Sequence, residues 1–342
     1  MRRKALSTGI AVLVIGVAAT ATTAALAGSA KRTAVSKIAI ATPAKANDYG
    51  WNQQGVAAAR VAAKVNGATL TVNDGIGYDN TQAVLLRLAR SGNHFVIAQA
   101  SGYNAIAPRV AVQTKVPMIS YDNPKNLIKD YMSDIETSSQ DGAYLAGVLA
   151  AKKTAANKLG IVISAADTNW YKQAGGFVAG ARSVNPDVKF SFAQVGQAAY
   201  DDAAGGKRVM QATIASGADV VFGMGDGATL GYIQAVETSK KKVWFIDVIG
   251  NPTPIDKKGA VLSSVLWDFS KVFKQAVADI NKGTYGTHFY TLGLNNGVSL
   301  LQTKYINGPT WKLIQQTRKG ILNGSIKVPL TPDKKSVTAL MK

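Results

Sequence analysis

Aromatic rings beside carboxylates and amides are the side chains in this sequence that could do chemistry, namely the binding of a planar polar ligand. The first set is Asp48, Tyr49, Trp51 and Asn52, in a loop between a strand-like run and an Ala-rich, helix-like run. A ring face supplies contact area, while carboxylates and amides orient the ligand by hydrogen bonds. The alternative is structural: Trp51 would pack on the core, and Asp48 or Asn52 would cap the helix.

The same combination recurs after later strand-like runs, in both halves of the chain. A single tryptophan at a strand end can equally well pack two lobes together, so the repetition is what favours a binding cleft. Open α/β sheets hold their ligands in loops at the carboxyl ends of strands. The sequence therefore predicts a ligand site formed by Asp48, Tyr49, Trp51, Asn52, Ser101, Tyr103, Asp122, Trp170, Asp226, Asp247, Trp267 and Asp268.

Sequence signals of catalysis, metal binding and cofactor binding are weak. The chain has no cysteine and only two histidines, His94 and His288, which lie far apart. It lacks a Walker A motif, an H-E-x-x-H motif and a G-x-S-x-G nucleophile elbow. The glycine-rich run at 223–227 misses the third spaced glycine of a dinucleotide site, and its aspartate would repel a pyrophosphate. We therefore predict a protein that is not an enzyme and uses neither a metal nor a cofactor.

Strand-like and helix-like runs must position these loops, and they alternate in two series. Strands are predicted at 37–41, 68–72, 94–98, 116–120, 131–134, 159–163, 188–195, 219–223, 243–249 and 260–266. Helices are predicted at 56–65, 80–90, 105–113, 140–152, 176–184, 203–216, 230–236, 273–280 and from 309 to before 324. Such alternation implies parallel, right-handed crossovers. The sequence thus predicts an α/β protein of two doubly wound lobes, with the polar loops facing the crevice between them.

The N-terminus and the charge balance indicate an exported protein. A basic start, an apolar stretch at 9–27 and an A-x-A site at 25–27 predict a signal peptide over residues 1–27, and an uncleaved anchor is the alternative. The net charge is +19, of which the predicted peptide carries +3, leaving +16 (19 minus 3). Such a protein could meet an anionic cell-wall or membrane surface. The basic residues are scattered and not interleaved with aromatics, so we predict no nucleic-acid partner.

Several stretches resemble the basic membrane protein family, the substrate-binding proteins of nucleoside-type ABC importers. They are residues 141–150 (DGAYLAGVLA), 176–181 (GFVAGA), 184–189 (VNPDVK), 216–222 (SGADVVF), 231–235 (GYIQA) and 321–329 (ILNGSIKVP). The resemblance covers essentially the whole chain after the signal and extends to purine nucleoside receptor lipoproteins. It implies a type I periplasmic-binding-protein fold, in which two Rossmann-like α/β/α lobes enclose a ligand cleft.

The resemblance also implies a domain division and a function. The N-terminal lobe would consist of residues 36–138 and 250–283, and the C-terminal lobe of residues 139–249 and 284–330. Residues 331–342 are predicted to be a flexible tail. The protein would bind a purine nucleoside or base for an ABC permease and ATPase. Trp51 would take the place of the family's aromatic over the base, and Asn52 would keep the amide that contacts its edge.

Three departures from the family pattern limit what the resemblance implies. The aspartate that holds ribose hydroxyls is shifted or missing around Asp247, and Trp267 stands where many members carry lysine. A bare base or another small polar ring is therefore an alternative ligand. Ser29 stands where a lipobox would carry its lipidated cysteine, which predicts an envelope-associated or released protein without cysteine lipidation. Further alternatives are a receptor for a sugar, amino acid derivative or signalling molecule without an importer, and a basic envelope protein with a vestigial cleft.

Overall fold

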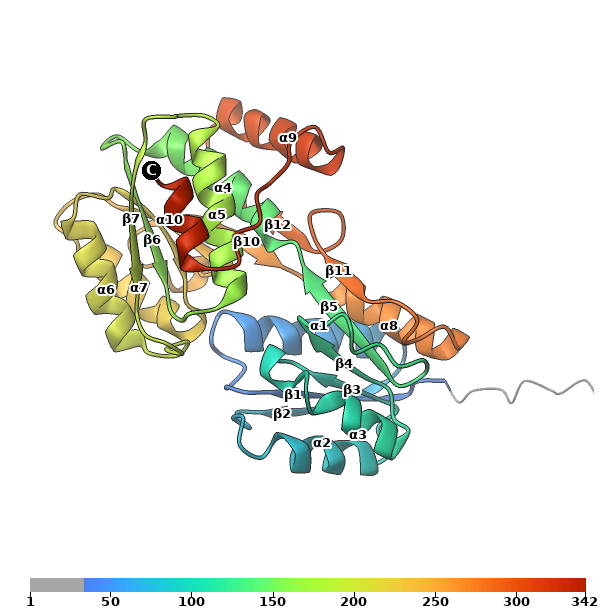
Figure 1. The fold of residues 1–342 in the computed structure, drawn as a ribbon. Coiled ribbons are helices and arrows are strands. Elements are labelled where there is room, and N and C mark those ends of the chain that lie inside the picture. The colour runs from blue at the N-terminus through green and yellow to red at the C-terminus, as the bar shows by residue number, and fades with distance from the viewer. Residues whose placement is uncertain (1–33) are drawn as a thin grey trace, which may run out of the picture. The chain divides into compact units, whose positions relative to one another are not determined.

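The computed structural model describes residues 34–342, so the predicted signal peptide lies outside the described residues. The chain forms two six-stranded sheets covered by helices on both faces (Figure 1). This arrangement confirms the predicted α/β fold class with two lobes. Within residues 34–342, no helix is long and apolar enough to cross a membrane.

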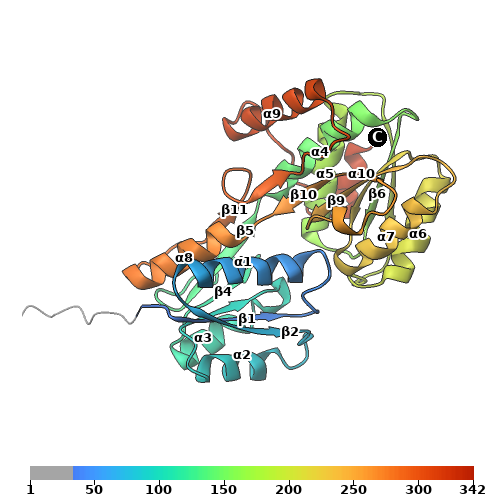
Figure 2. The ribbon, with the colours of Figure 1, turned by 180° about the vertical axis from the view of Figure 1, so that it is seen from behind.

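The first sheet has the strand order β11-β5-β4-β3-β1-β2, and all its pairings are parallel. Its strands are β1 (Lys37–Thr42), β2 (Thr69–Asp74), β3 (Phe95–Ala98), β4 (Met118–Tyr121), β5 (Met132–Thr137) and β11 (Tyr290–Leu292). Together with α1 (Trp51–Val65), α2 (Thr81–Arg90), α3 (Ala107–Thr114) and α8 (Ser270–Lys282), this sheet makes the first lobe. Figure 2 shows α1 and α8 side by side on one face, with α2 and α3 on the other.

The second sheet has the order β12-β10-β9-β8-β6-β7. Its strands are β6 (Lys158–Ile163), β7 (Lys189–Gln194), β8 (Val220–Met224), β9 (Trp244–Ile249), β10 (Val261–Trp267) and β12 (Val298–Leu300). The second lobe adds α4 (Ser139–Lys153), α5 (Thr168–Arg182), α6 (Ala203–Ala215), α7 (Thr229–Glu237), α9 (Gly308–Leu322) and α10 (Lys334–Leu340). Three 3-10 turns complete the elements: Ser101–Tyr103, Asp226–Ala228 and Thr253–Ile255.

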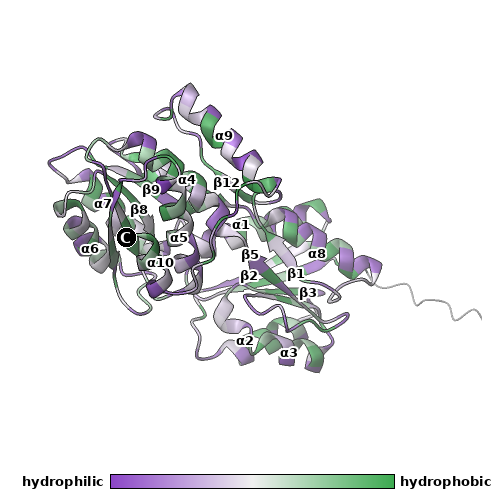
Figure 3. Cartoon of the chain, turned by 45° about the horizontal axis from the view of Figure 1, so that its top comes forward, coloured by the Kyte–Doolittle hydropathy of each residue, from purple (hydrophilic) through white to green (hydrophobic). Residues whose placement is uncertain are grey.

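Burial on both faces explains why the central strands are continuous apolar runs. In β1, Ile38 and Ile40 belong to the core under α1, whereas Ala39 and Ala41 belong to the core under α2 and α3. Successive side chains of a strand point to opposite faces, so a strand between two helical layers needs apolar residues at every position. Figure 3 shows the consequence, with hydrophobic central strands and helices that are hydrophilic on one side.

Glycines let α4 and α5 pack unusually close together. A Cβ on Gly147 would meet the carbonyl of Phe177, and a Cβ on Gly180 would meet the carbonyl of Tyr144. Only glycine permits this approach of two helix backbones. These glycines lie in the stretches that carry the family resemblance, and the packing they allow fixes the start of α5, where two cavity residues stand.

The predicted assignment of chain segments to lobes needs correction. Strand β10 pairs with β9 and β12, so residues 261–267 lie in the second sheet and not in the N-terminal lobe as predicted. The chain returns to the first lobe only with α8, and β11 then pairs with β5 of the first sheet. The short strand β12 also breaks the all-parallel expectation, because it runs antiparallel to β10. Strand order is set by long-range pairing, which local sequence patterns do not encode.

The prediction of a flexible tail over 331–342 is wrong. Asp333 caps α10 by accepting a hydrogen bond from the Ser336 amide at 2.8 Å, and Ser336 completes a capping box. Val337 is fully buried, and Nη2 of Arg182 donates to the Met341 carbonyl at 2.7 Å. The tail is therefore a helix docked on α5.

We expect Val337→Asp to release this helix, because a buried carboxylate without a partner is costly. The substitution should lower stability by about 2 kcal/mol or more, measured as a drop in Tm, and should make the C-terminus sensitive to limited proteolysis. Ala339→Asp introduces the same charge at an exposed position of α10 and should change neither readout. Equal behaviour of the two variants would show that α10 does not stabilise the lobe.

Candidate functional site

A cavity of about 760 Å³ lies where the carboxyl ends of strands from both sheets meet. Both lobes contribute to its wall. The lining residues are Pro43, Ala44, Trp51, Asn52, Tyr78, Ala100, Ser101, Gly102, Asp167, Asn169, Trp170, Ala198, Ala199, Tyr200, Asp201, Asp202, Asp226 and Trp267. Small-molecule sites usually have volumes of about 300–1,000 Å³, so this cavity has the size of a ligand site.

The first-lobe wall is built on a tight turn before α1. Asp48 is buried, and its carboxylate accepts hydrogen bonds from the amides of Gly50, Asn52 and Gln53 at 2.9–3.1 Å. It also accepts from Nδ2 of Asn52 at 2.6 Å. These bonds satisfy free amides at the helix start, which is the capping role considered as the alternative for Asp48. Asp48 does not line the cavity itself but fixes the loop that does.

Trp51, the first residue of α1, is held edge-on by other rings. Its centroid lies 4.7 Å from that of Tyr121, 5.3 Å from Phe269 and 6.0 Å from Trp267, all in T-shaped geometry. Nε1 of Trp51 donates to the carbonyl of Gln99 at 2.8 Å. The indole is therefore fixed in orientation while it remains half-buried and lines the cavity. Such edge-to-face contacts favour a rigid platform.

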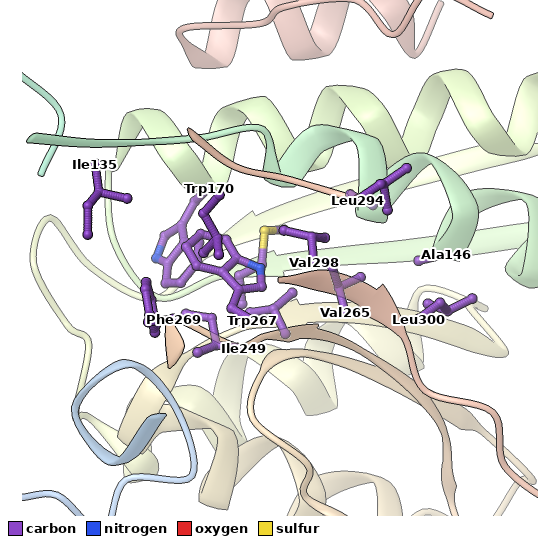
Figure 4. Packing of buried hydrophobic residues seen from close by; sticks show 14 of the residues in the cluster. Ile135, Ala146, Trp170, Ile249, Val265, Trp267, Phe269, Leu294, Val298 and Leu300 are labelled. Carbon is purple, nitrogen blue, oxygen red and sulfur yellow. The ribbon is translucent and has the colours of Figure 1, made fainter. Parts of the chain in front are cut away.

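The second-lobe wall is organised by Asp167, which caps α5. Its carboxylate accepts from the Asn169 amide at 2.7 Å and from the hydroxyl of Tyr200 at 2.8 Å. Trp170 follows in the first turn of α5, and its Nε1 donates to Oγ of Ser164 at 3.2 Å. Figure 4 shows Trp170 and Trp267 in the same hydrophobic cluster as Phe269 and Ile249. Helix α5 starts several residues earlier than predicted, which moves Trp170 from a loop onto a helix.

Hydrogen bonds join the lobes around the cavity, among them one from the hydroxyl of Thr137 to Oδ1 of Asn169 at 3.0 Å. The backbone amide of Trp51 donates to Oδ1 of Asp226 at 3.0 Å. Nδ2 of Asn169 donates to Oδ2 of Asp122 at 3.0 Å, and the hydroxyl of Ser101 donates to the same oxygen. Asp122 does not line the cavity, so the structure gives it a place in the contact between the lobes.

The loops at this contact contain left-handed backbones at residues other than glycine. They are Tyr49 (φ 56°), Asp122 (φ 61°), Asp226 (φ 46°) and Ile249 (φ 69°). A positive φ is costly for side chains with a Cβ, above all for a β-branched one such as isoleucine. Strained residues of this kind gather at functional sites because surrounding structure holds them there.

The cavity is acidic, in contrast to the chain as a whole. Asp167, Asp201, Asp202 and Asp226 line it, and among the described residues neither lysine nor arginine does. Burial, and then the charge of Asp48, raise the pKa of Asp226 well above its usual 3.8. Burial raises the pKa of Asp201 too, and burial with nearby carboxylates raises that of Tyr78 to about 12. Among the described residues, the cavity lining therefore offers a ligand several hydrogen-bond acceptors and no side chain with a permanent positive charge.

Of the remaining predicted residues, four lie behind the walls. Tyr49 contributes its amide, which donates to Oε1 of Gln53 at 3.1 Å. Tyr103 is buried, and its hydroxyl donates to the Gly77 carbonyl at 2.6 Å. Asp247 accepts from Thr229 at 3.0 Å, and Asp268 accepts from the Ser270 amide at 2.8 Å where α8 begins. The structure does not bring these four into the lining, which contains Trp51, Asn52, Ser101, Trp170, Asp226 and Trp267 of the predicted set.

The prediction missed two of the loops that line the cavity. Tyr78 follows β2, and Tyr200 with Asp201 and Asp202 follows β7. Both loops repeat the pattern of an aromatic beside a carboxylate after a strand, so the same rule applied to every strand would have found them. Within residues 34–342, no group of three or more histidines and carboxylates is arranged to hold a metal ion.

Comparison with known proteins gives the relationship of this chain. The family model described as "ABC transporter substrate-binding protein PnrA-like" matches residues 35–331. The nucleoside-binding protein BmpA of an ABC transporter from Lactococcus lactis subsp. cremoris (strain MG1363) is 28% identical over 319 residues, covering 86% of this chain and 89% of that protein. A purine-binding protein from Brucella abortus (strain 2308) is 29% identical over 147 residues, covering 42% of this chain and 41% of its own.

Solved structures agree on the fold. A solute-binding protein of an ABC transporter system from Conexibacter woesei DSM 14684 superposes with a TM-score of 0.73 at 19% identity, covering 86% of this chain and 99% of its own. The resemblance seen in the sequence is thereby confirmed, and the chain belongs to the family of PnrA-like substrate-binding proteins of ABC transporters.

Proposed function

We propose that this protein is the extracytoplasmic receptor of an ABC importer and closes on a purine nucleoside or base. The observation that carries the proposal is the cavity between the lobes, which combines five aromatic residues with amide and carboxylate acceptors. The five are Trp51, Tyr78, Trp170, Tyr200 and Trp267. The nucleoside-binding and purine-binding relatives support this choice among planar ligands.

The proposed roles follow from where the side chains stand. The indoles of Trp51 and Trp170 would contact the ring faces of the ligand, and Asn52 and Ser101 would bind its polar edge. Asp226 at the lobe contact would accept from ligand hydroxyl or amine groups. Asp48 and Asp122 would act through the loop and the lobe contact that they hold, and Asp247 and Asp268 from behind the wall.

Partners and location form part of the same proposal. A receptor of this family would deliver its ligand to a permease and an ATPase, outside the cytoplasm, and without turnover.

Thermal-shift screening would distinguish a purine nucleoside or base from the alternative ligands, a sugar or an amino acid derivative. At about a hundred times its dissociation constant a ligand adds roughly 2.7 kcal/mol of stability. The panel would contain nucleosides, bases, sugars and amino acids.

Closure is the proposed means by which ligand binding is transmitted. Gly250 directly follows β9 of the second lobe, and a Cβ placed on it would meet the carbonyl oxygen of Tyr49 in the first lobe. Gly50 faces Asp226 in the same way. A ligand shifts such an equilibrium only by its differential affinity for the closed form. The cavity, whose wall comes from both lobes, provides that difference.

Trp51→Ala should weaken binding of the best nucleoside or base from the panel by more than about tenfold, since the indole supplies a large fixed contact. Isothermal titration calorimetry measures the change. Trp311→Ala, a half-buried tryptophan of α9 outside the cavity, serves as the control and should leave affinity unchanged. Survival of binding within about threefold, roughly 0.7 kcal/mol, would exclude the proposed contact.

Asp226→Asn should stabilise the free protein at pH 8. The raised pKa means that the folded state holds the proton more tightly than the unfolded chain, so this group costs stability as pH rises above 3.8 through the folded value. Asparagine keeps the acceptor for the Trp51 amide and removes the charge. We expect a rise in Tm of about 2–4 °C at pH 8, fading towards pH 4.

The control for this measurement is Asp187→Asn at an exposed position, which should show no such pH-dependent difference. A variant of Asp226 that is less stable than the wild type at pH 8 would mean that the carboxylate is compensated where it lies.

Gly250→Ala should keep the lobes from meeting, because the Tyr49 carbonyl belongs to backbone and cannot rotate away. We expect ligand affinity to fall by about tenfold or more and small-angle scattering to show a larger radius of gyration in the presence of ligand. Gly308→Ala is the matched control, since a Cβ there meets nothing within 4 Å. If Gly250→Ala bound the ligand with wild-type affinity, this contact between the lobes would not be needed for ligand binding.

A further inference from the structure

A second cavity, of about 670 Å³, lies at the opposite end of the second sheet from the ligand cavity. Lys242 stands just before β9, Lys257 and Lys258 stand just before β10, and Lys304 follows the antiparallel strand β12. These are the amino ends of the parallel strands, whereas the ligand cavity lies at their carboxyl ends. Lys153, the last residue of α4, joins them. We call Lys153, Lys242, Lys257, Lys258 and Lys304 the lysine cluster.

A pair of aromatic rings lies at the centre of the lysine cluster. The centroids of Trp244 and Tyr305 are 5.0 Å apart. Nζ of Lys153 lies 4.2 Å and Nζ of Lys242 4.0 Å from the Trp244 centroid, and Nζ of Lys304 lies 5.3 Å from that of Tyr305. Attraction between an ammonium group and a ring face holds these side chains in place.

Backbone carbonyls fix the lysine cluster further. Lys242 donates to the Gly259 carbonyl at 3.0 Å, Lys258 to that of Glu237 at 2.7 Å, and Lys153 to that of Tyr305 at 3.3 Å. Each ammonium group has three donors, so donors remain for a ligand. Four of the five lysines, all but Lys257, are therefore held by neutral partners.

No carboxylate within residues 34–342 forms an ion pair with a member of the lysine cluster; the ion pairs found there join Lys45 to Asp74 and His288 to Asp279. Asp256, which lines the cavity, and Glu237 beside it are engaged with backbone amides. Asp256 accepts from the amides of Ala260 and Val261 at 2.8–2.9 Å, and Glu237 accepts from the Lys257 amide at 2.6 Å. Five positive charges gathered without ion pairs repel one another, and an anion in the cavity would relieve that repulsion.

We propose that this cavity binds a linear phosphate polymer through the lysine cluster. Lysine binds phosphate as a point charge, and lysines from separate segments around one hollow suit several phosphates on one chain. A membrane surface fits less well, because the large exposed hydrophobic side chains of residues 34–342 lie elsewhere. Nucleic acid also fits less well, because ammonium groups already cover the Trp244 ring that a base would stack on.

The site goes beyond the proposed function, because it lies away from the ligand cavity and shares no lining residue with it. Both cavities can be filled at once. A receptor held by a phosphate polymer at this end keeps the mouth between its lobes free. Ligand binding and polymer binding are therefore independent measurements.

The test uses the full chain and long-chain inorganic polyphosphate, with affinity measured by calorimetry at about 50 and about 200 mM salt. The triple variant Lys257→Gln, Lys258→Gln, Lys304→Gln should bind at least about tenfold more weakly and show a shallower salt dependence, because fewer counterions are exchanged. The matched control is Lys64→Gln, Lys271→Gln, Lys282→Gln, exposed lysines of α1 and α8. It removes the same charge and should lose less than about twofold.

Four other outcomes would overturn the proposal. Equal losses in both triple variants would mean attraction by net charge alone, and no binding of polyphosphate by the wild type would remove the site. Pelleting with phosphatidylglycerol vesicles in the absence of polyphosphate binding would assign the lysine cluster to a membrane. Single-stranded DNA that binds as tightly as polyphosphate would assign it to nucleic acid. Unchanged circular dichroism and Tm would show that the variants fold.

Discussion

The hydrogen bond from the Trp51 amide to the Asp226 carboxylate is the contact on which the ligand cavity depends. It joins the first residue of α1 in one lobe to a buried acid in the other, over 3.0 Å. The amino terminus of a helix offers free N–H groups and a partial positive charge, which offset part of the cost of burying the Asp226 carboxyl. The bond requires close approach, which is why glycine stands at position 50, where a Cβ would collide with Asp226. The cavity wall forms around this point.

Local patterns predicted the alternation of strands and helices because both sheets lie between helical layers. Strands that are buried on both faces need apolar residues at every position, and such continuous apolar runs are visible in the sequence. They did not predict β11 and β12, because strands of three residues leave too short a pattern. The placement of β10 in the second sheet depends on its pairing with β9, a contact that no local pattern contains. The tail helix was missed because the packing of α10 on α5, which accompanies the burial of Val337, joins distant segments.

For the site, the rule that ligands meet loops after parallel strands predicted the loops that line the cavity more reliably than the individual side chains that line it. Trp51 and Asp48 lie three residues apart, yet one lines the cavity and the other turns back to bind the helix amides. Tyr103 likewise points into the core beside Tyr78, which lines the cavity. The turn geometry decides which way each side chain points, and here several turns contain left-handed residues whose side chains sequence patterns do not orient.

The two ends of the second lobe carry side chains of opposite charge, so each end favours a different class of ligand. Four aspartates line the ligand cavity, whereas three members of the lysine cluster, Lys257, Lys258 and Lys304, line the far cavity together with Asp256. A phosphate-bearing molecule loses its hydration and gains repulsion at the first end, but finds ammonium donors at the second. The high positive net charge of the chain therefore gives no information about the ligand of the cavity. The positive charge lies on the outside of the molecule, while the buried, acidic cavity would favour the proposed planar ligand with hydrogen-bond donors.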